Sequence, residues 1–279
     1  MVISSARGGR ANQAFLRFSV AFVAVALIAV SVSLYLSTRY LEEQQRLSDT
    51  GDTEGAMQSV EMASQLDPFS AEPLLAEASL LQSEGRNVEA ERVLQAAAER
   101  EPADYEVPQE LGDLRLESMN QPIEASESYQ RALELNPMSS DTRTGLATAY
   151  LSAGELERAK TQYERLRESG GLSVNQLYDL GRIYVRTGEP GKGVSTLRQT
   201  QNRTESGLQG LTGQLREQQL GFVLSVELAL ADALVVQRRY DEARQIVAGS
   251  FAEQAPTILS LINSDPEGYR QTVIDSDVY

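Results

Sequence analysis

The residues that could do chemistry in this chain of 279 residues are its carboxylates, because the sequence contains no histidine and no cysteine. Without an imidazole or a thiol, no Ser–His or Cys–His nucleophilic pair can form, and a zinc site with nitrogen and sulfur ligands is excluded. Adjacent acids occur at Glu42-Glu43 and Asp241-Glu242, in segments whose pattern indicates solvated helix faces. The sequence therefore predicts no catalytic, cofactor-binding or metal-binding residues, and we expect a protein that is not an enzyme.

Motifs for nucleotide or acyl chemistry are missing from the sequence as well. It has no P-loop, no GxGxxG that opens a helix and no GxSxG elbow. A glycoside hydrolase would need two acids that face one pocket, and no spacing in the sequence suggests such a pair. A carboxylate-dependent enzyme that acts on surface polysaccharide is therefore the least favoured alternative.

The net charge of −15 is distributed unevenly along the chain. Residues 1–39 carry four arginines, at 7, 10, 17 and 39, and no acid, so this segment has a charge of +4 and the remainder has −19. So acidic a remainder repels phosphate backbones and anionic lipid headgroups. We therefore expect no nucleic-acid partner.

An uncharged apolar run, 18–36, follows the basic flank 1–17. As a helix, this run would extend about 28 Å, close to the thickness of the hydrocarbon core of a bilayer. Tyr35 and Tyr40 lie near its end, where interfacial aromatic residues are common. Because a positive flank tends to stay in the cytoplasm, the sequence predicts a single-pass membrane protein with a cytoplasmic N-terminus and an extracytoplasmic remainder.

A cleaved signal peptide is the alternative reading of the same run. The small-x-small triplets 29–31 and 31–33 could serve as cleavage sites. The apolar run continues past both triplets, which favours an uncleaved anchor, but the sequence alone leaves cleavage open.

Residues that end helices recur at a nearly constant spacing after residue 40. Pro68, Pro102 and Pro137 are 34 and 35 residues apart, and Gly171 follows after another 34. Small residues that would let two helices approach closely recur in register with these breakers, at Ala78, Gly112, Ala147, Gly181 and Ala231. This period predicts stacked helical hairpins, because no single hairpin can bury its apolar face alone.

These recurring features resemble the tetratricopeptide repeat (TPR) family over roughly residues 37–256. The resemblance implies an all-α fold, in which an N-terminal transmembrane helix precedes an α-solenoid of about five to six hairpins. One short helix around Leu259–Ile262 is expected to cap the array. The expected segments are a basic flank (1–17), the transmembrane helix (18–36), TPR-like repeats (37–207), a linker or helix extension (208–223), a last hairpin (224–256) and a cap with an acidic tail (257–279).

In the TPR family, the first helix of each hairpin lines a groove that binds a protein or peptide. Positions two, five, nine and twelve of the hairpins that start at 71, 105, 140 and 174 supply the candidate contacts. From these positions we expect partner contacts at Leu75, Glu106, Gln109, Asp113, Asp141, Thr148, Tyr178 and Arg182. The acids would favour a basic or amphipathic segment, and Tyr178 would be the anchor of the interface. The Lys and Asn residues of the family's carboxylate-clamp members are largely absent here, so that function is not implied.

The favoured function is a membrane-tethered scaffold for protein–protein interaction, or an assembly factor for an envelope complex. Similar arrays are part of bacterial envelope proteins, and the resemblance to them lies in the order of anchor and array only. In the main alternative, the anchor helix pairs with a multi-span membrane partner and the array acts as a spacer.

Overall fold

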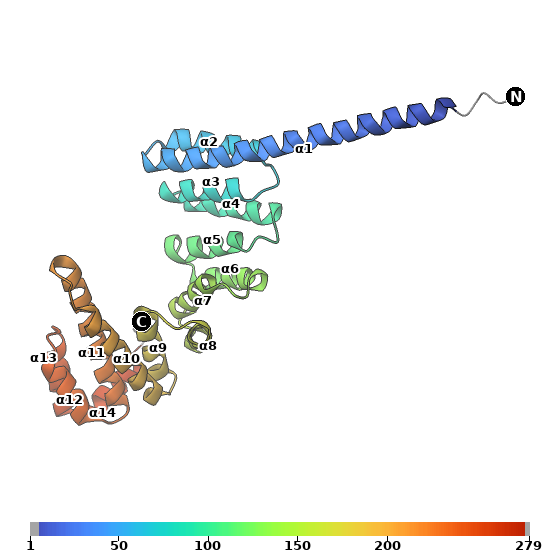
Figure 1. Ribbon diagram of the computed structural model, residues 1–279. Helices are drawn as coiled ribbons and strands as arrows, with labels where there is room; N and C mark the ends of the chain where they lie inside the picture. The colour runs from blue at the N-terminus through green and yellow to red at the C-terminus, as the bar shows by residue number, and fades with distance from the viewer. Residues whose placement is uncertain (1–5, 277–279) are drawn as a thin grey trace. The chain divides into compact units, whose positions relative to one another are not determined.

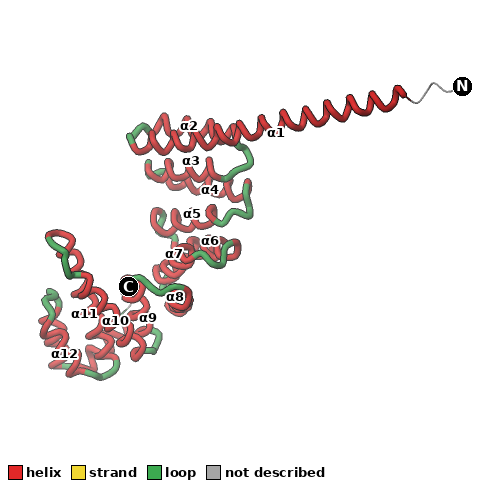
Figure 2. The backbone as a smooth tube through the Cα atoms, in the orientation of Figure 1, coloured by secondary structure: helices red, strands yellow, loops and turns green. Residues whose placement is uncertain are grey.

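The computed structural model describes residues 6–276, and side chains from residue 19 onward; residues 1–5 of the basic flank and 277–279 of the predicted acidic tail lie outside this description. Every regular element within it is helical (Figures 1 and 2). The elements are α1 (Ala6–Asp49), α2 (Thr53–Leu66), α3 (Glu72–Ser83), α4 (Asn87–Arg100), α5 (Glu106–Asp113) with a π-helical continuation η1 (Leu114–Ser118), α6 (Pro122–Leu135), α7 (Ser140–Ser152), α8 (Leu156–Ser169), α9 (Val174–Arg186), α10 (Pro190–Gly207), α11 (Gly213–Val236), α12 (Tyr240–Gly249), α13 (Ala255–Ser264) and α14 (Pro266–Asp275).

The chain divides into two compact units, with the boundary after residue 120. Unit 1 runs up to Asn120 and contains α1 to η1, and unit 2 starts at Gln121 and contains α6 to α14. Within each unit, helices that follow one another in the sequence pack as antiparallel neighbours, as in α1–α2, α3–α4, α7–α8, α9–α10 and α11–α12. Both units are therefore built from stacked helical hairpins, which confirms the predicted all-α solenoid.

The helices that close the early hairpins end with the same backbone geometry. Asp67, Glu101 and Asn136 have φ between −128° and −133° and ψ between 76° and 83°, and each directly precedes a proline. A proline pushes the preceding residue out of the helical region and cannot donate a backbone hydrogen bond itself. The spacing of the prolines therefore sets the length of each hairpin.

The turn inside a hairpin requires a left-handed backbone residue. Gly85, Gly154 and Gly188 fill this position with φ between 73° and 79°, a conformation that glycine adopts without a steric penalty. Arg238 fills it in the last hairpin with φ 61°, and Asn120 precedes α6 with φ 53°. The hairpin geometry is thus retained even where the glycine is replaced.

Close approach of paired helices occurs where the sequence predicted small residues. All five of these residues, Ala78, Gly112, Ala147, Gly181 and Ala231, are buried. At Gly181 of α9, an added Cβ atom would lie 2.7 Å from Cγ of Leu197 on α10, and Leu197 is itself fully buried. The absence of a side chain therefore sets the separation of α9 and α10.

The C-terminal part of the array differs from the sequence-based expectation in its cap. The segment 208–223, predicted as a linker or helix extension, contains the start of α11 at Gly213, and only residues 208–212 lie outside helices. The cap contains two helices, α13 and α14, where the sequence predicted one. Asp265 accepts a hydrogen bond from the Gly268 amide and so caps the start of α14. The spacing of apolar residues, on which the sequence prediction depended, does not detect such a polar cap.

The apolar run and the first hairpin form one continuous helix, α1. Two helices of the described chain are long and apolar enough to cross a bilayer, the part of α1 from Ser19 and α11. In α11, 39% of the most apolar 18-residue stretch is buried, because this helix supplies core residues of unit 2. None of the corresponding stretch in α1 is buried. Ser33 Oγ donates to the Leu66 carbonyl at 2.7 Å and Ser37 Oγ donates to the Ala63 carbonyl at 3.1 Å, so α2 packs against the last turns of the apolar run.

Substituting alanine for two helical glycines should separate close packing from helix propensity. Gly181→Ala should lower the free energy of unfolding by about 1–3 kcal/mol, because the new methyl group overpacks against Leu197. Gly221→Ala in α11 meets open space and should be neutral or stabilise by up to about 1 kcal/mol. Urea unfolding of both variants measures the difference, and equal destabilisation would contradict the packing described here.

Candidate protein-binding surface

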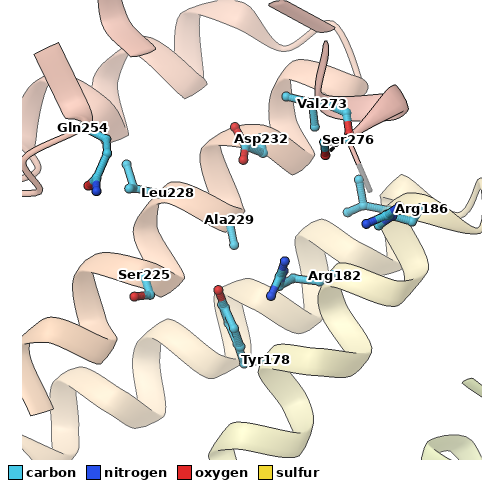
Figure 3. Close-up of a pocket in the computed structure, with 11 residues that line it drawn as sticks. Tyr178, Arg182, Arg186, Ser225, Leu228, Ala229, Asp232, Gln254, Val273 and Ser276 are labelled. Atoms are coloured by element: carbon cyan, nitrogen blue, oxygen red, sulfur yellow. Dashed lines mark hydrogen bonds between the residues drawn. The ribbon is translucent and has the colours of Figure 1, made fainter. Parts of the chain in front are cut away.

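A cavity of about 300 Å³ lies in unit 2 between α9, α11 and α14 (Figure 3). Figure 3 shows the side chains of Tyr178 and Arg182 directed from α9 toward α11. The lining combines two guanidinium groups and one carboxylate with several apolar side chains. The lining residues are Tyr178, Arg182, Val185 and Arg186 from α9, Ser225, Leu228, Ala229 and Asp232 from α11, Gln254 before α13, and Val273 and Ser276 at the end of α14.

The cavity lies on the face that repeat counting marks as the binding face. Positions five, nine and twelve of the hairpin that starts at residue 174 are Tyr178, Arg182 and Val185, and all three line the cavity. The same count applied to the hairpin that starts at 224 gives Ser225, Leu228 and Asp232 at positions two, five and nine, which also line it. The first helices of two consecutive hairpins therefore form this site.

Tyr178 is held in place by aromatic and cationic neighbours. Its ring contacts the Phe222 ring edge to face, with centroids 5.4 Å apart, and the Arg182 guanidinium carbon lies 5.3 Å from its centroid. Burial raises the pKa of the Tyr178 hydroxyl, and the Arg182 charge opposes that rise. The predicted anchor residue is thus half-buried and also packs against the core of unit 2.

Asp232 is the one carboxylate that lines the cavity. Tyr269 of α14 donates a hydrogen bond of 2.7 Å from its hydroxyl to Asp232 Oδ1. Removal from water raises the pKa of Asp232 to about 6, although the Tyr269 hydrogen bond and the Arg182 charge both favour the ionised form. The cavity therefore holds a carboxyl group whose charge changes close to neutral pH.

The other predicted contacts do not line this cavity. Asp141 and Thr148 lie on α7 in unit 2, where Asp141 is exposed and Thr148 Oγ1 donates to the Thr144 carbonyl at 3.0 Å. In unit 1, Leu75 packs against the core between α3 and its neighbours. Of the eight predicted residues, Tyr178 and Arg182 line this cavity.

The three remaining predicted contacts lie on α5 in unit 1. Glu106 is exposed in the first turn, and Gln109 and Asp113 follow on the same helix, half-buried. Burial, followed by the charges of Asp113 and Glu106, raises the pKa of the neighbouring Glu110. α5 thus carries a concentration of negative charge, as the sequence predicted for this part of the array.

Several residues of the cavity were missed by the sequence analysis. Arg186 follows Arg182 by one helical turn, and Ser225, Leu228 and Asp232 follow from extending the repeat count by one hairpin. Val273 lies in α14 and Ser276 directly follows it, and because α14 has no counterpart in the repeat pattern, no periodic signal could have identified them.

The fold and this cavity define an α-solenoid of helical hairpins, a class in which ligands bind on surfaces shared by neighbouring repeats. The tetratricopeptide repeat family matches residues 116–172 of the chain. A comparison with curated proteins gave no significant match.

Among solved structures, the chain is similar to MamA (21% identity, TM-score 0.54, covering 64% of this chain and 97% of MamA). It is also similar to PilW, described as a type IV pilus biogenesis factor (19%, 0.55, 80% and 98%), and to PilF of Pseudomonas aeruginosa (17%, 0.57, 85% and 99%). Residues 116–172 therefore match tetratricopeptide repeats, and the solved structures share the α-solenoid fold of the chain.

The raised pKa of Asp232 predicts a defined pH dependence of stability. A proton on this carboxyl group favours the folded state, so its contribution is fully present below about pH 4 and is lost as the pH rises through about 6. Asp232→Asn keeps an acceptor for the Tyr269 hydroxyl and carries no charge. The variant should therefore be more stable than the wild type at pH 7.5, by at most about 3 kcal/mol.

Urea unfolding between pH 4 and 8 measures this difference, which should close toward pH 4. Asp141→Asn removes an exposed carboxylate of α7 and serves as the control, with no comparable change across this range. A pH-independent difference between the Asp232 variant and the wild type would show that Asp232 is not withdrawn from water.

Proposed function

We propose that this protein is a membrane-tethered TPR scaffold that binds a partner protein in the cavity between α9 and α11 and helps to assemble an envelope complex. The observation that carries the proposal is that the first helices of two consecutive hairpins form one cavity with apolar, cationic and anionic groups. A lining with apolar and charged groups suits a peptide segment, which offers both kinds of group, better than a ligand that is only apolar or only charged. The similarity to a type IV pilus biogenesis factor supports an assembly role.

The partner segment is amphipathic, because Leu228, Ala229 and Val273 offer apolar contact beside the charged groups of the cavity. Basic residues of the partner are attracted by the array as a whole, which is strongly acidic and carries exposed acids such as Glu106 and Asp141. This attraction makes the association rate fall as the salt concentration rises. An association rate that does not depend on salt would remove the basic character from the proposal.

The tether is the N-terminal part of α1, which is apolar and has none of its most apolar 18-residue stretch buried within the chain. Large apolar side chains from Val20 to Leu36 are exposed, and α2 packs against the end of this stretch, at Ser33. A helical stretch whose apolar side chains are exposed in this way is suited to lipid or to another membrane helix. The second possibility corresponds to the alternative function, in which α1 pairs with a multi-span protein and the array is a spacer.

A larger side chain in the cavity should block the partner without disturbing the core. Ser225 is exposed, and its hydroxyl donates only to the Gly221 carbonyl of its own helix, so Ser225→Trp should fill the cavity while the fold persists. Binding of the partner captured from solubilised membranes should weaken at least about tenfold, or 1.4 kcal/mol. Unchanged binding would exclude this cavity as the docking site.

Ser206→Trp is the matched control, because Ser206 is an exposed helical serine that donates to the Asn202 carbonyl and lies outside the cavity. This variant should bind like the wild type. Replacing α1 up to Ser31 with an unrelated membrane helix separates the two functions, since partner binding survives the exchange only if the array carries it.

The proposed topology predicts a protease-sensitive array. With the N-terminus in the cytoplasm, protease added to cells stripped of their outer layers should digest the chain after residue 41. A cytoplasmic marker protein should survive the same treatment as the control. Protection of the whole array would reverse the proposed orientation.

A further inference from the structure

Phe69 is more exposed than any other large apolar side chain described in unit 1, at 83%. It lies in the loop between α2 and α3, which is held by several hydrogen bonds. The Ser70 amide donates to Asp67 Oδ1 at 3.3 Å, and the Ala71 amide donates to Glu101 Oε2 at 3.0 Å. A fixed loop therefore holds a phenylalanine ring in contact with solvent, an arrangement that is unfavourable in water.

The position of this loop along α1 is set by the hydrogen bond from Ser33 to the Leu66 carbonyl. α2 runs antiparallel to α1 and ends at Leu66, so the loop starts at the level of Ser33 (Figure 1). Ser33 lies within the uncharged run 18–36, and the first charged residue after that run is Arg39, six residues later. At 1.5 Å per residue, the loop starts about 9 Å closer to the middle of the run than Arg39 does.

We propose that the α2–α3 loop inserts Phe69 into the interface of the bilayer that holds α1. This inference rests on the proposed membrane anchoring of α1. A bilayer that covers the run as far as Leu36 also covers the level of Ser33, and so it reaches the loop. The loop thereby becomes a second point of contact with lipid, at the depth that interfacial apolar side chains occupy, about 5–10 Å into the boundary between headgroups and acyl chains.

The surroundings of Phe69 suit an interface with lipid. Met62 and Leu66 in the last turns of α2 and Pro68 add apolar surface at the same end of the hairpin, and Met62 is 40% exposed. The two nearby carboxylates, Asp67 and Glu101, accept backbone hydrogen bonds from the loop, which lowers the cost of taking them partly out of water. Because Asp67 and Glu101 are both acidic, the α2–α3 loop should bind zwitterionic lipid in preference to anionic lipid.

A single tryptophan can report on the depth of this loop, because the sequence contains no tryptophan. We would reconstitute full-length Phe69→Trp into phosphatidylcholine nanodiscs, with and without bromine on the acyl chains. The inference predicts a blue-shifted tryptophan emission that brominated lipid quenches. Phe69 is exposed, so the substitution should leave the melting temperature unchanged.

Two further variants make the outcomes distinguishable. Val88→Trp places the reporter at a residue that is 57% exposed, twelve residues before Arg100 in α4. Because Arg100 Nη1 donates to the Ser70 carbonyl, Val88 lies about 18 Å from the loop end of the hairpins and should not be quenched. Phe22→Trp, in the first third of the run, tests the anchor itself.

Quenching of the reporters at positions 22 and 69, but not at 88, is the expected result. Quenching at 22 but not at 69 or 88 would overturn the loop insertion and leave the anchor intact. No quenching at 22 would overturn the anchoring, and the insertion with it.

Discussion

Each hairpin of this protein has an apolar face that only its neighbour can cover, and the rest of the structure follows from that constraint. Within a hairpin, small residues let the two helices approach closely, as Gly181 of α9 does beside Leu197 of α10. Packing of this kind is short in range, so each hairpin depends on the next one rather than on a common centre. The same arrangement leaves the first helices of the hairpins free to supply a binding surface, since their buried sides already hold the array together.

The charges of the chain are organised around this frame. Basic residues and the uncharged run occupy the N-terminal part, and the array carries the excess of acid. Most of the described ion pairs in the array join residues three apart in the sequence and are exposed, as in Arg131–Glu134 and Arg158–Glu155, so they add little to stability. Arg115–Glu91 differs, because it joins η1 to α4 and is mostly shielded from water, and it contributes to the contact between neighbouring helices.

The features that could be predicted from the sequence are those that repeat. Helix-ending prolines such as Pro68 and Pro102, and small buried residues such as Ala78, recur at nearly constant intervals. Each hairpin has to satisfy the same packing constraint, so the pattern of one hairpin predicts the others. The cavity was predicted only in part, through Tyr178 and Arg182, since its other wall belongs to the last hairpin and to α14. α14 makes its contacts once in the chain, and the Tyr269–Asp232 hydrogen bond joins residues 37 apart with no periodic signal. The acids on α5 could be predicted from the sequence, but the division of the chain after residue 120 could not, because the repeat pattern continues across that position.

The continuity of α1 has a mechanical consequence. From Ser19 to Asp49 this helix contains no proline and no glycine, the residues at which helices usually kink, and its Ser33 and Ser37 donate hydrogen bonds to carbonyls of α2. No flexible joint separates the apolar half of α1 from the first hairpin, so the two tilt and rotate together as a rigid body. A long apolar helix adjusts its inclination to the thickness of the bilayer around it. If α1 spans a bilayer as proposed, the inclination of unit 1 follows the tilt of this helix and so changes with the thickness of the bilayer.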